Sequence, residues 1–274
     1  MALLGFQQAL SELVMSPEFC FQVLTSPEQA LRVFDLTSRE YQRLVFLAQL
    51  PGIGIGRMLH RSFRLSMLVN ILPKTCTLLN FQNLNQVFDI YWQIQPPRNF
   101  YYEQEAVRFG EFLLAQLEQG LLQNEFLEEI LRFELCVLFL TKFIPEQGAG
   151  NNSFQIGDLK DFFPDLNPKY RIVFFRHQPN SLLTTLSESR MPEAGLQGEY
   201  YLLLTMSSTN QLQIKPIGSR MGEVLLACNG QRSGEDLCTQ LSLNLEDLEI
   251  LAKKGFISQY SSVKAKTLCQ SQFF

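Results

Sequence analysis

The chain has 274 residues, 46% of them hydrophobic, with 27 acidic and 23 basic side chains and a formal net charge of −4. This length and apolar content suit one large domain or two smaller ones, each with a core of its own. The acidic balance disfavours a protein that binds duplex DNA, because Lys and Arg contacts to phosphates supply most of that affinity.

The cysteines and the apolar segments indicate a cytoplasmic protein without a membrane segment. Six cysteines occur without a Cys-x-x-Cys pair, and Cys20, Cys76 and Cys136 fall inside apolar helical patterns. Such residues are typical of reduced thiols that act as small buried hydrophobes. The first residues lack the basic segment and cleavage site of a signal peptide. The longest apolar run, 133–144, is too short to span a bilayer and contains two charged residues.

Residues 1–50 are predicted to form a small helical module. Two Ser-Pro-Glu triplets, beginning at Ser16 and Ser26, each offer an N-cap serine, a proline at the first helical position and an acid in the first turn. Thr37 and Glu40 match a capping box that opens a further helix. We expect Pro51 and the glycine after it to end this helix.

Residues 54–145 are predicted to form an all-α bundle. Its first helix carries an apolar stripe at spacings of four, while three arginines lie on a neighbouring face; the stripe is Leu59, Phe63, Met67 and Ile71. Further helices are expected from Pro73, over 84–92 before Pro96-Pro97, over 103–117 and over 126–143. The last is apolar nearly all round, which is typical of a central helix.

The remaining residues are predicted to form a linker and loop over 146–169, a smaller α+β module over 170–260 and a mobile tail over 261–274. The linker is clearest at 147–153, which is small, polar and unpatterned. In the module we expect a strand at 170–175, a short helix near 182–186, a hairpin of strands 200–206 and 212–217, and three short helices after it. The fold class is therefore α+β: an N-terminal all-α helical bundle followed by a smaller winged-helix-like module.

No catalytic or metal-binding constellation is recognisable in the sequence. Its two histidines, His60 and His177, fall in different predicted domains and take part in no metal-ligand spacing. The three glycines at 52, 54 and 56 follow a helix and lack the lysine of a phosphate-binding loop, so we interpret them as a flexible turn between helices. The paired acids Glu128-Glu129 and Glu246-Asp247 are interpreted as solvated or first-turn acids of helices. We therefore expect no catalytic residue, metal or cofactor in this chain.

The most conspicuous polar cluster lies near the start of the predicted bundle. Its members can meet on adjacent faces of one helix: Arg57, His60, Arg61 and Arg64. One interpretation is a solvated face paired with nearby acids. A second is a surface that docks an acidic partner, because planar guanidinium groups suit carboxylates. Contact with DNA phosphates is a third, which the overall charge disfavours.

The predicted hairpin offers a second mode of recognition. An edge strand presents unpaired backbone groups, so an extended peptide can add to it as a further strand. The peptide-binding candidates are Tyr200, Leu202, Leu204, Gln213 and Lys215. The alternative is an ordinary strand pair packed under the helices. Pro216 cannot donate a ladder hydrogen bond, which fits an edge or a strand end.

Two blocks of residues resemble a known family. The first runs from Arg57-Met-Leu-His60-Arg61-Ser-Phe63-Arg64 through Leu72-Pro73, Pro96-Pro97 and Glu105 to Leu131-Arg-Phe133-Glu134. The second comprises Gly222-Glu223-Val-Leu225-Leu226-Ala227 and Leu251-Ala-Lys-Lys-Gly255-Phe256-Ile257. In this order they resemble the family labelled as a DNA-binding domain, which includes the partner subunits of methanobactin and bufferin biosynthesis. The module at 1–50 is an addition to the family pattern.

The resemblance implies a function for this chain. Such proteins bind a multinuclear non-haem iron oxidative enzyme through one surface and the leader of a ribosomally synthesised precursor peptide by strand pairing in the C-terminal part. The resemblance implies that this chain is a non-catalytic subunit of a hetero-oligomer and that the iron belongs to the partner enzyme. The acidic balance disfavours nucleic acid as a ligand. The arginine cluster would dock the enzyme.

Two other functions remain open. The first is a DNA-binding transcriptional regulator that uses the C-terminal module. It would need a basic helix there, yet acids outnumber lysines over 234–254. The second is an enzyme in its own right, with a cofactor enclosed by the helical bundle.

Overall fold

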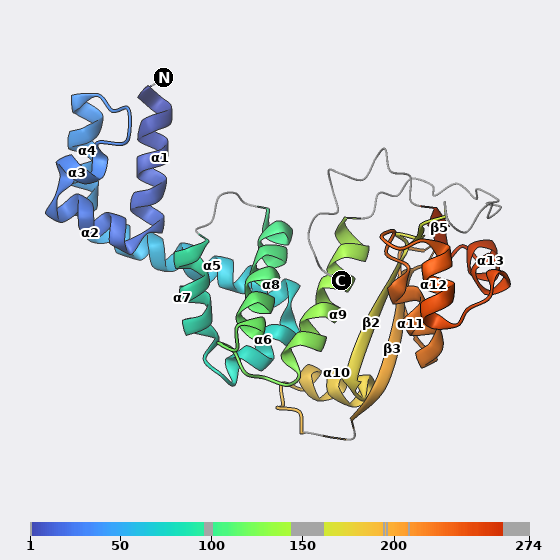
Figure 1. Cartoon of the computed structure of the whole chain (residues 1–274). Helices are drawn as coiled ribbons and strands as arrows, with labels where there is room; N and C mark the ends of the chain where they lie inside the picture. The colour runs from blue at the N-terminus through green and yellow to red at the C-terminus, as the bar shows by residue number, and fades with distance from the viewer. Residues whose placement is uncertain are drawn as a thin grey trace. The chain divides into compact units, whose positions relative to one another are not determined.

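The computed structural model describes residues 2–95, 101–143, 162–193, 195, 197–207 and 209–259. The chain divides into two compact units, Met1–Phe112 and Leu113–Phe274. The described residues form thirteen helices and two small antiparallel sheets, which confirms the predicted α+β class with a helical N-terminal region (Figure 1). The predicted linker at 147–153, the residues Pro96-Pro97 and the tail at 261–274 lie outside the described residues.

The first unit is helical throughout its described part. Its elements are α1 (Ala2–Met15), α2 (Pro17–Thr25), α3 (Pro27–Leu31), α4 (Ser38–Ala48), α5 (Pro51–Ile71), α6 (Pro73–Asn80), α7 (Leu84–Ile94) and the beginning of α8 (Tyr102–Glu118). Helices α1 to α4 enclose a core that includes Leu13, Val23 and Leu44, each of which is completely buried. The predicted module at 1–50 thus has apolar packing of its own.

The helix starts follow the local chemistry of the sequence. Ser16 caps α2, because its hydroxyl accepts a 3.0 Å hydrogen bond from the Phe19 N–H. Thr37 and Glu40 form the predicted capping box of α4. The backbone and hydroxyl of Thr37 donate to the Glu40 carboxylate, and these bonds lower the pKa of Glu40. Ser26, by contrast, makes no side-chain capping bond at the start of α3.

The glycine-rich segment after α4 is helical, so its interpretation as a flexible turn was wrong. Helix α5 begins at Pro51 and runs without interruption through Gly52, Gly54 and Gly56. Proline is favoured at the first helical position because its fixed φ suits a helix and its missing N–H has no intrahelical acceptor there. Pro51 therefore starts a helix here instead of only ending the one before it.

The second unit is built around a three-stranded antiparallel sheet. Its elements are the end of α8, α9 (Leu127–Lys142), β1 (Pro164–Leu166), β2 (Tyr170–His177), α10 (Pro179–Ser187), β3 (Gln197–Met206), β4 (Leu212–Ile217), α11 (Ser219–Ala227), α12 (Gly234–Leu241), α13 (Leu245–Lys253) and β5 (Ile257–Gln259). The strand order is β2-β3-β4, and β1 pairs separately with β5. The predicted hairpin and the three helices after it are confirmed; β1 and β5 were not predicted.

Helices cover both faces of the sheet (Figure 1). Phe175 of β2 packs against Phe133 of α9, with ring centroids 6.0 Å apart. Ile172 belongs to the core cluster shared with α11, α12 and α13. Because neighbouring side chains of a strand alternate between faces, α9 lies on one face and α11 to α13 on the other. Helix α9, predicted as the centre of a bundle over 54–145, thus packs on this sheet. The division between the units falls inside α8.

Helix α11 approaches β3 closely at a glycine. A Cβ atom on Gly222 would lie 2.2 Å from the ring of Tyr201, at the ring atoms nearest the Tyr201 backbone. We therefore expect Gly222→Ala to destabilise the protein by about 1–3 kcal/mol, because the methyl group must push α11 away from the sheet. Urea denaturation followed by far-UV circular dichroism measures the change.

Gly195→Ala is the control for this substitution, because nothing lies within 4 Å of a Cβ atom at that position and the residue lies outside the helices and strands. We expect its free energy of unfolding to stay within about 0.5 kcal/mol of the wild type. Equal stability of the two variants would contradict the close contact between α11 and β3.

Candidate peptide-binding edge and polar networks

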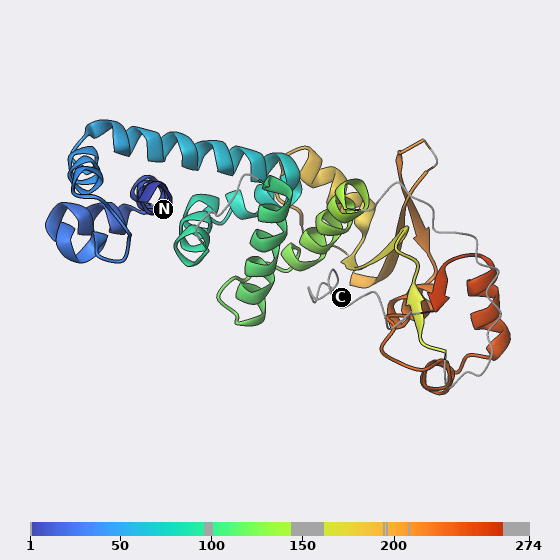
Figure 2. The same cartoon turned by 90° about the horizontal axis from the view of Figure 1, so that it is seen from above.

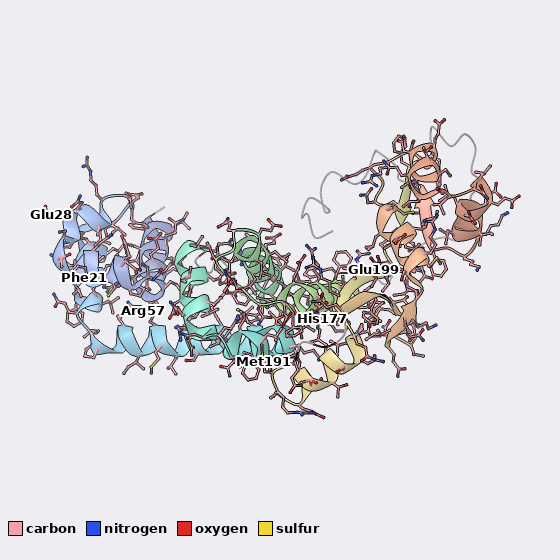
Figure 3. The ribbon with its side chains drawn as sticks, turned by 60° about the horizontal axis from the view of Figure 1, so that its bottom comes forward. Phe21, Glu28, Arg57, His177, Met191 and Glu199 are labelled. Carbon is pink, nitrogen blue, oxygen red and sulfur yellow. The ribbon has the colours of Figure 1, made fainter. Side chains whose placement is uncertain are left out.

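The predicted docking cluster on α5 is taken up by contacts within the first unit. Arg57 donates 3.1 and 3.2 Å hydrogen bonds to the carbonyl oxygens of Leu13 and Val14 (Figure 3). These carbonyls belong to the last turn of α1, which lacks intrahelical donors. Arg57 therefore closes the C-terminal end of α1 against α5.

The other two arginines bind carboxylates of neighbouring helices. Arg61 forms a 2.8 Å ion pair with Asp89 of α7, and their side chains are 28% and 53% exposed. Arg64 is 1% exposed and pairs with Glu105 of α8, which is 3% exposed. The Arg64 guanidinium also lies 5.8 Å from the ring centroid of Tyr102. Arg64 is thus a core residue.

His60 also turns toward the interior of the first unit. It is half-buried, with its ring centroid 5.7 Å from that of Trp92. Burial lowers the pKa of His60, and the positive charge of Arg64 lowers it further. A neutral imidazole at pH 7 follows from both effects. The prediction that Arg57, His60, Arg61 and Arg64 form an open docking face was therefore wrong, because three of the four are engaged with helices of their own unit.

Three of the five predicted peptide-binding residues lie on the central strand of the sheet. Strand β3 is hydrogen-bonded to β2 on one side and to β4 on the other. Leu202 and Leu204 are 5% and 0% exposed, and Tyr200 is half-buried. A peptide cannot add to a strand whose two edges are paired. The prediction was wrong for these three residues, and only Gln213 and Lys215 lie on an edge strand.

Strand β4 is that edge, and four of its six residues are exposed. Its outward backbone groups follow from the pairing register. The Ser207 N–H donates a 2.8 Å bond to the Gln211 carbonyl, which closes the hairpin. Antiparallel pairs alternate between hydrogen-bonded and non-hydrogen-bonded, so the backbone groups of Gln213 and Lys215 point toward β3. The backbone N–H and C=O groups of the residues on either side of these two point away from β3.

Leu212, Ile214 and Pro216 therefore present the outer edge of β4. They offer two N–H donors and three carbonyl acceptors, since proline lacks the N–H. Proline costs no ladder hydrogen bond at an outward position, which explains why β4 tolerates Pro216. Leu212 and Ile214 were not among the predicted binding residues. The hydrogen bond between Ser207 and Gln211 fixes the register and so identifies these two residues as outward-pointing. Pro216, two positions after Ile214, was the sequence signal for this register.

The outer edge of β2 is less available than that of β4. The same alternation points the backbone groups of Tyr170, Ile172 and Phe174 away from β3, and Arg176 lies at a register shift where it has no β3 partner. The Tyr170 carbonyl accepts a 2.7 Å bond from Arg171, and the Arg176 N–H donates a 2.7 Å bond to Glu129. Both ends of this edge are thus already bonded. For the outward groups of β4, no such bond is found within the described residues.

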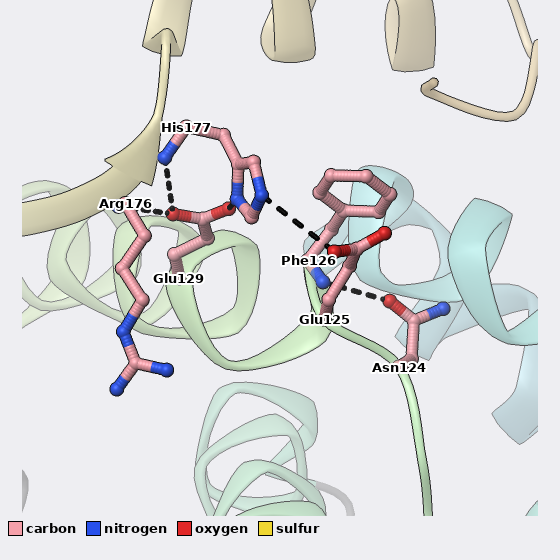
Figure 4. A network of polar contacts seen from close by, with 6 residues as sticks. All are labelled: Asn124, Glu125, Phe126, Glu129, Arg176 and His177. Atoms are coloured by element: carbon pink, nitrogen blue, oxygen red, sulfur yellow. Dashed lines mark hydrogen bonds and ion pairs between the residues drawn. The ribbon is translucent and has the colours of Figure 1, made fainter. Parts of the chain in front are cut away.

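A buried network joins the first turn of α9 to the end of β2 (Figure 4). One carboxylate oxygen of Glu129 lies 2.6 Å from Nδ1 of His177, and the other accepts the N–H groups of Arg176 and His177. Glu125 lies 3.8 Å from Nε2 of His177. Glu129 is 6% exposed, so its interpretation as a solvated acid was wrong. Its paired neighbour Glu128 does face solvent, where it binds Arg132.

The described residues contain no group of three or more His, Cys, Asp and Glu side chains that could hold a metal ion. Burial raises the pKa of both Cys136 and Cys228 to about 12, so these thiols stay protonated at neutral pH. A protonated thiol is a weak nucleophile. The buried cysteines therefore act as apolar side chains, as the sequence predicts for Cys136.

Among the helices that the structure describes, none combines the length and the apolar character needed to cross a bilayer. No protein-family model matches the chain, and no curated protein matches it significantly. A proposal for the function therefore rests on two things: the structure of β4 and its surroundings, and the resemblance of the two sequence blocks.

Proposed function

We propose that this chain is a non-catalytic partner subunit that captures a ribosomally synthesised precursor peptide along β4. It presents the peptide to a multinuclear non-haem iron oxidative enzyme, which holds the iron, in the cytoplasm. The observation that carries the proposal is the open outer edge of β4, with outward backbone groups at Leu212, Ile214 and Pro216. The resemblance of the sequence supplies the identity of the peptide and of the enzyme.

The chemistry of β4 limits the peptide that can bind there. Two donors and three acceptors match an extended segment of about five residues, because outward groups recur at every second position. A peptide residue opposite Ile214 shares the face of that side chain, which is 42% exposed. Its neighbour shares the face of Lys215. Cross-strand pairing therefore favours a leader in which an apolar residue precedes or follows an acidic one.

The helices of the C-terminal module are poorly suited to the alternative function, a DNA-binding regulator. Helices α12 and α13 carry acids in their first turns, namely Glu235, Asp236, Glu246 and Asp247. A recognition helix places its N-terminal residues against the bases and phosphates of the major groove. Carboxylates at these positions would repel the phosphates. The C-terminal module is therefore better suited to a peptide than to duplex DNA.

Ile214→Pro tests the peptide-binding edge. It removes one outward donor while leaving the β3–β4 ladder intact, as Pro216 already does two positions away. We expect the affinity for the leader peptide to fall about tenfold or more, because a carbonyl of the bound peptide loses its donor. Isothermal titration with a synthetic extended peptide that carries an apolar residue next to an acidic one measures the affinity.

Ile214→Val is the matched control, since it keeps the N–H and a β-branched side chain, and we expect its affinity to stay close to that of the wild type. Hydrogen exchange at the Leu212 and Ile214 amides should slow when the peptide binds. Unchanged affinity in the proline variant, or binding without protection at these two amides, would rule out β4 as the site. Pull-down with the tagged chain, followed by iron analysis of each co-purifying protein, tests the rest of the proposal: the iron should lie only in a co-purifying enzyme.

A further inference from the structure

One face of α5 is apolar, uncharged and exposed. Its large side chains Ile55, Leu59 and Phe63 are 56%, 63% and 52% exposed, and the adjacent Met58 is 60% exposed. A helix on a protein surface normally turns charged side chains to solvent. Here the only charged groups of α5 are its three arginines, and they lie on the opposite side of the helix against α1, α7 and α8. Leu59 and Phe63 of the predicted apolar stripe are thus exposed, whereas Met67 and Ile71 are half-buried and the three arginines contact neighbouring helices.

Small residues alternate with the large ones on this face. Gly52 and Gly56 precede Ser62 and Ser66 along α5, which Figure 2 shows as one long helix. Nothing lies within 4 Å of a Cβ atom built on Gly52 or Gly56. Glycine inside a helix is less stable than alanine, and no contact of the described structure needs the space. Close approach of another backbone to this face is a use for these glycines.

The order of large and small residues reads the same in both directions. Leu59 is the centre, Ile55 and Phe63 are the large residues four positions away, and small residues stand three and seven positions away on each side. At 3.6 residues per turn all seven positions lie on one face: Gly52, Ile55, Gly56, Leu59, Ser62, Phe63 and Ser66. A two-fold axis at Leu59 would therefore place large residues opposite large ones and small residues opposite small ones.

We propose that this face binds the same face of a second copy of the chain, with the two α5 helices antiparallel across a two-fold axis at Leu59. A two-fold interface must be self-complementary, because the same patch is used twice. The symmetric residue pattern meets this requirement, and the absence of charge means that like charges do not meet across the axis. The small residues let the helices approach so that large side chains fill the spaces between them.

The exposed area sets the expected strength of the dimer. Ile55, Met58, Leu59 and Phe63 leave roughly 400 Å² exposed on each copy, about half of the surface that each partner buries in a standard interface. With the small residues between them, two copies bury roughly 1,000 Å², the lower limit for a specific interface. The dimer should therefore form and dissociate with concentration in the micromolar range.

Charge substitutions at Leu59 test the axis, because this residue faces itself in the dimer. We expect Leu59→Glu and Leu59→Lys, each alone, to weaken dimerisation at least a hundredfold, since two like charges then meet at the centre. Mixing the two variants should restore a dimer that contains one copy of each. Light scattering after size exclusion over a range of concentrations measures the mass, and different affinity tags identify the mixed dimer.

Val33→Glu is the matched control, because Val33 is 82% exposed in the same unit and lies outside α5. We expect its dimer to have the wild-type affinity, and all variants to keep the wild-type circular dichroism spectrum. A wild-type protein that stays monomeric at every concentration would overturn the proposal. So would a dimer that survives Leu59→Glu. Wild-type monomers that lose a complex with a different protein through Leu59→Glu would assign the face to that protein instead.

Discussion

Replacing Arg64 with methionine is expected to lower the free energy of unfolding by about 3–5 kcal/mol, because it leaves the carboxylate of Glu105 buried without its partner. Methionine has nearly the length of the aliphatic part of arginine, so the decrease in the free energy of unfolding comes mainly from the lost charge and hydrogen bonds. Trp92, the only tryptophan of the chain, lies in the same unit and reports its unfolding by fluorescence. Urea denaturation followed at this residue gives the change.

Two further variants separate the buried pair from ordinary ion pairing. The double variant Arg64→Met with Glu105→Leu should recover most of the lost stability, since removal of both charges eliminates the unpaired group. Arg61→Met, which removes the exposed pair with Asp89, should cost about 1 kcal/mol or less. If Arg64→Met costs no more than Arg61→Met, the buried pair does not stabilise the first unit.

The pH dependence of the Arg64 variant has a definite sign. Burial raises the pKa of Glu105, while the hydrogen bonds and the charge of Arg64 lower it. Without Arg64 the pKa of Glu105 rises further, so the folded state holds the proton more tightly than the unfolded state does. The stability gained from protonating Glu105 is fully present below its pKa in the unfolded state. It is lost as the pH rises through its pKa in the folded state. Arg64→Met should therefore be more stable at pH 5 than at pH 8, relative to the wild type.

Replacing Glu129 with alanine is expected to lower the free energy of unfolding by about 2–4 kcal/mol, because it leaves two backbone N–H groups and the His177 ring without their acceptor. The contact joins α9 to the end of β2, so the effect should appear in the second unit. Far-UV circular dichroism in urea measures the stability. Hydrogen exchange at the amides of Arg176 and His177 should accelerate, which locates the effect.

The neighbouring acid provides the control for this substitution. Glu128→Ala removes only an exposed pair with Arg132 four residues away, so it should cost no more than about 0.5 kcal/mol. Glu129→Gln keeps an acceptor oxygen for the backbone and should lie between the two alanine variants. Equal stability of Glu128→Ala and Glu129→Ala would show that the network contributes nothing to the second unit.

Several elements of the fold follow from short-range chemistry and were predictable. The capping box of Thr37 and Glu40 begins α4 because both partners lie within one turn of each other. The three short helices expected after the hairpin are α11, α12 and α13, and β2 begins at the predicted residue Tyr170. The strands β1 and β5 could not be found in this way. Each has three residues, too few to show a period, and each is stabilised by pairing with the other across the sequence.

For the candidate peptide-binding site, too, local sequence predicted one part and long-range pairing decided the other. The sequence correctly identified the hairpin as the place of an edge, and Pro216 as a sign of it, but not which strand was open. Leu202 and Leu204 are as apolar as an edge residue such as Ile214. Only the addition of β2 to the other side of β3 makes them central. An edge strand is paired on one side and a central strand on both, and the residues of a strand do not by themselves specify how many partners it has.

The sequence by itself determined the α+β class, the positions of most helices and strands, and the amphipathic character of α5. Each depends on interactions between residues a few positions apart, which periodicity and capping reveal. The tertiary structure alone decided that the arginines of α5 turn inward and that Leu59 and Phe63 face solvent. The periodicity of a helix separates its two faces but does not say which one is covered. Here carbonyl groups on α1 and carboxylates on α7 and α8 bind the three arginines, so the polar face packs against neighbouring helices.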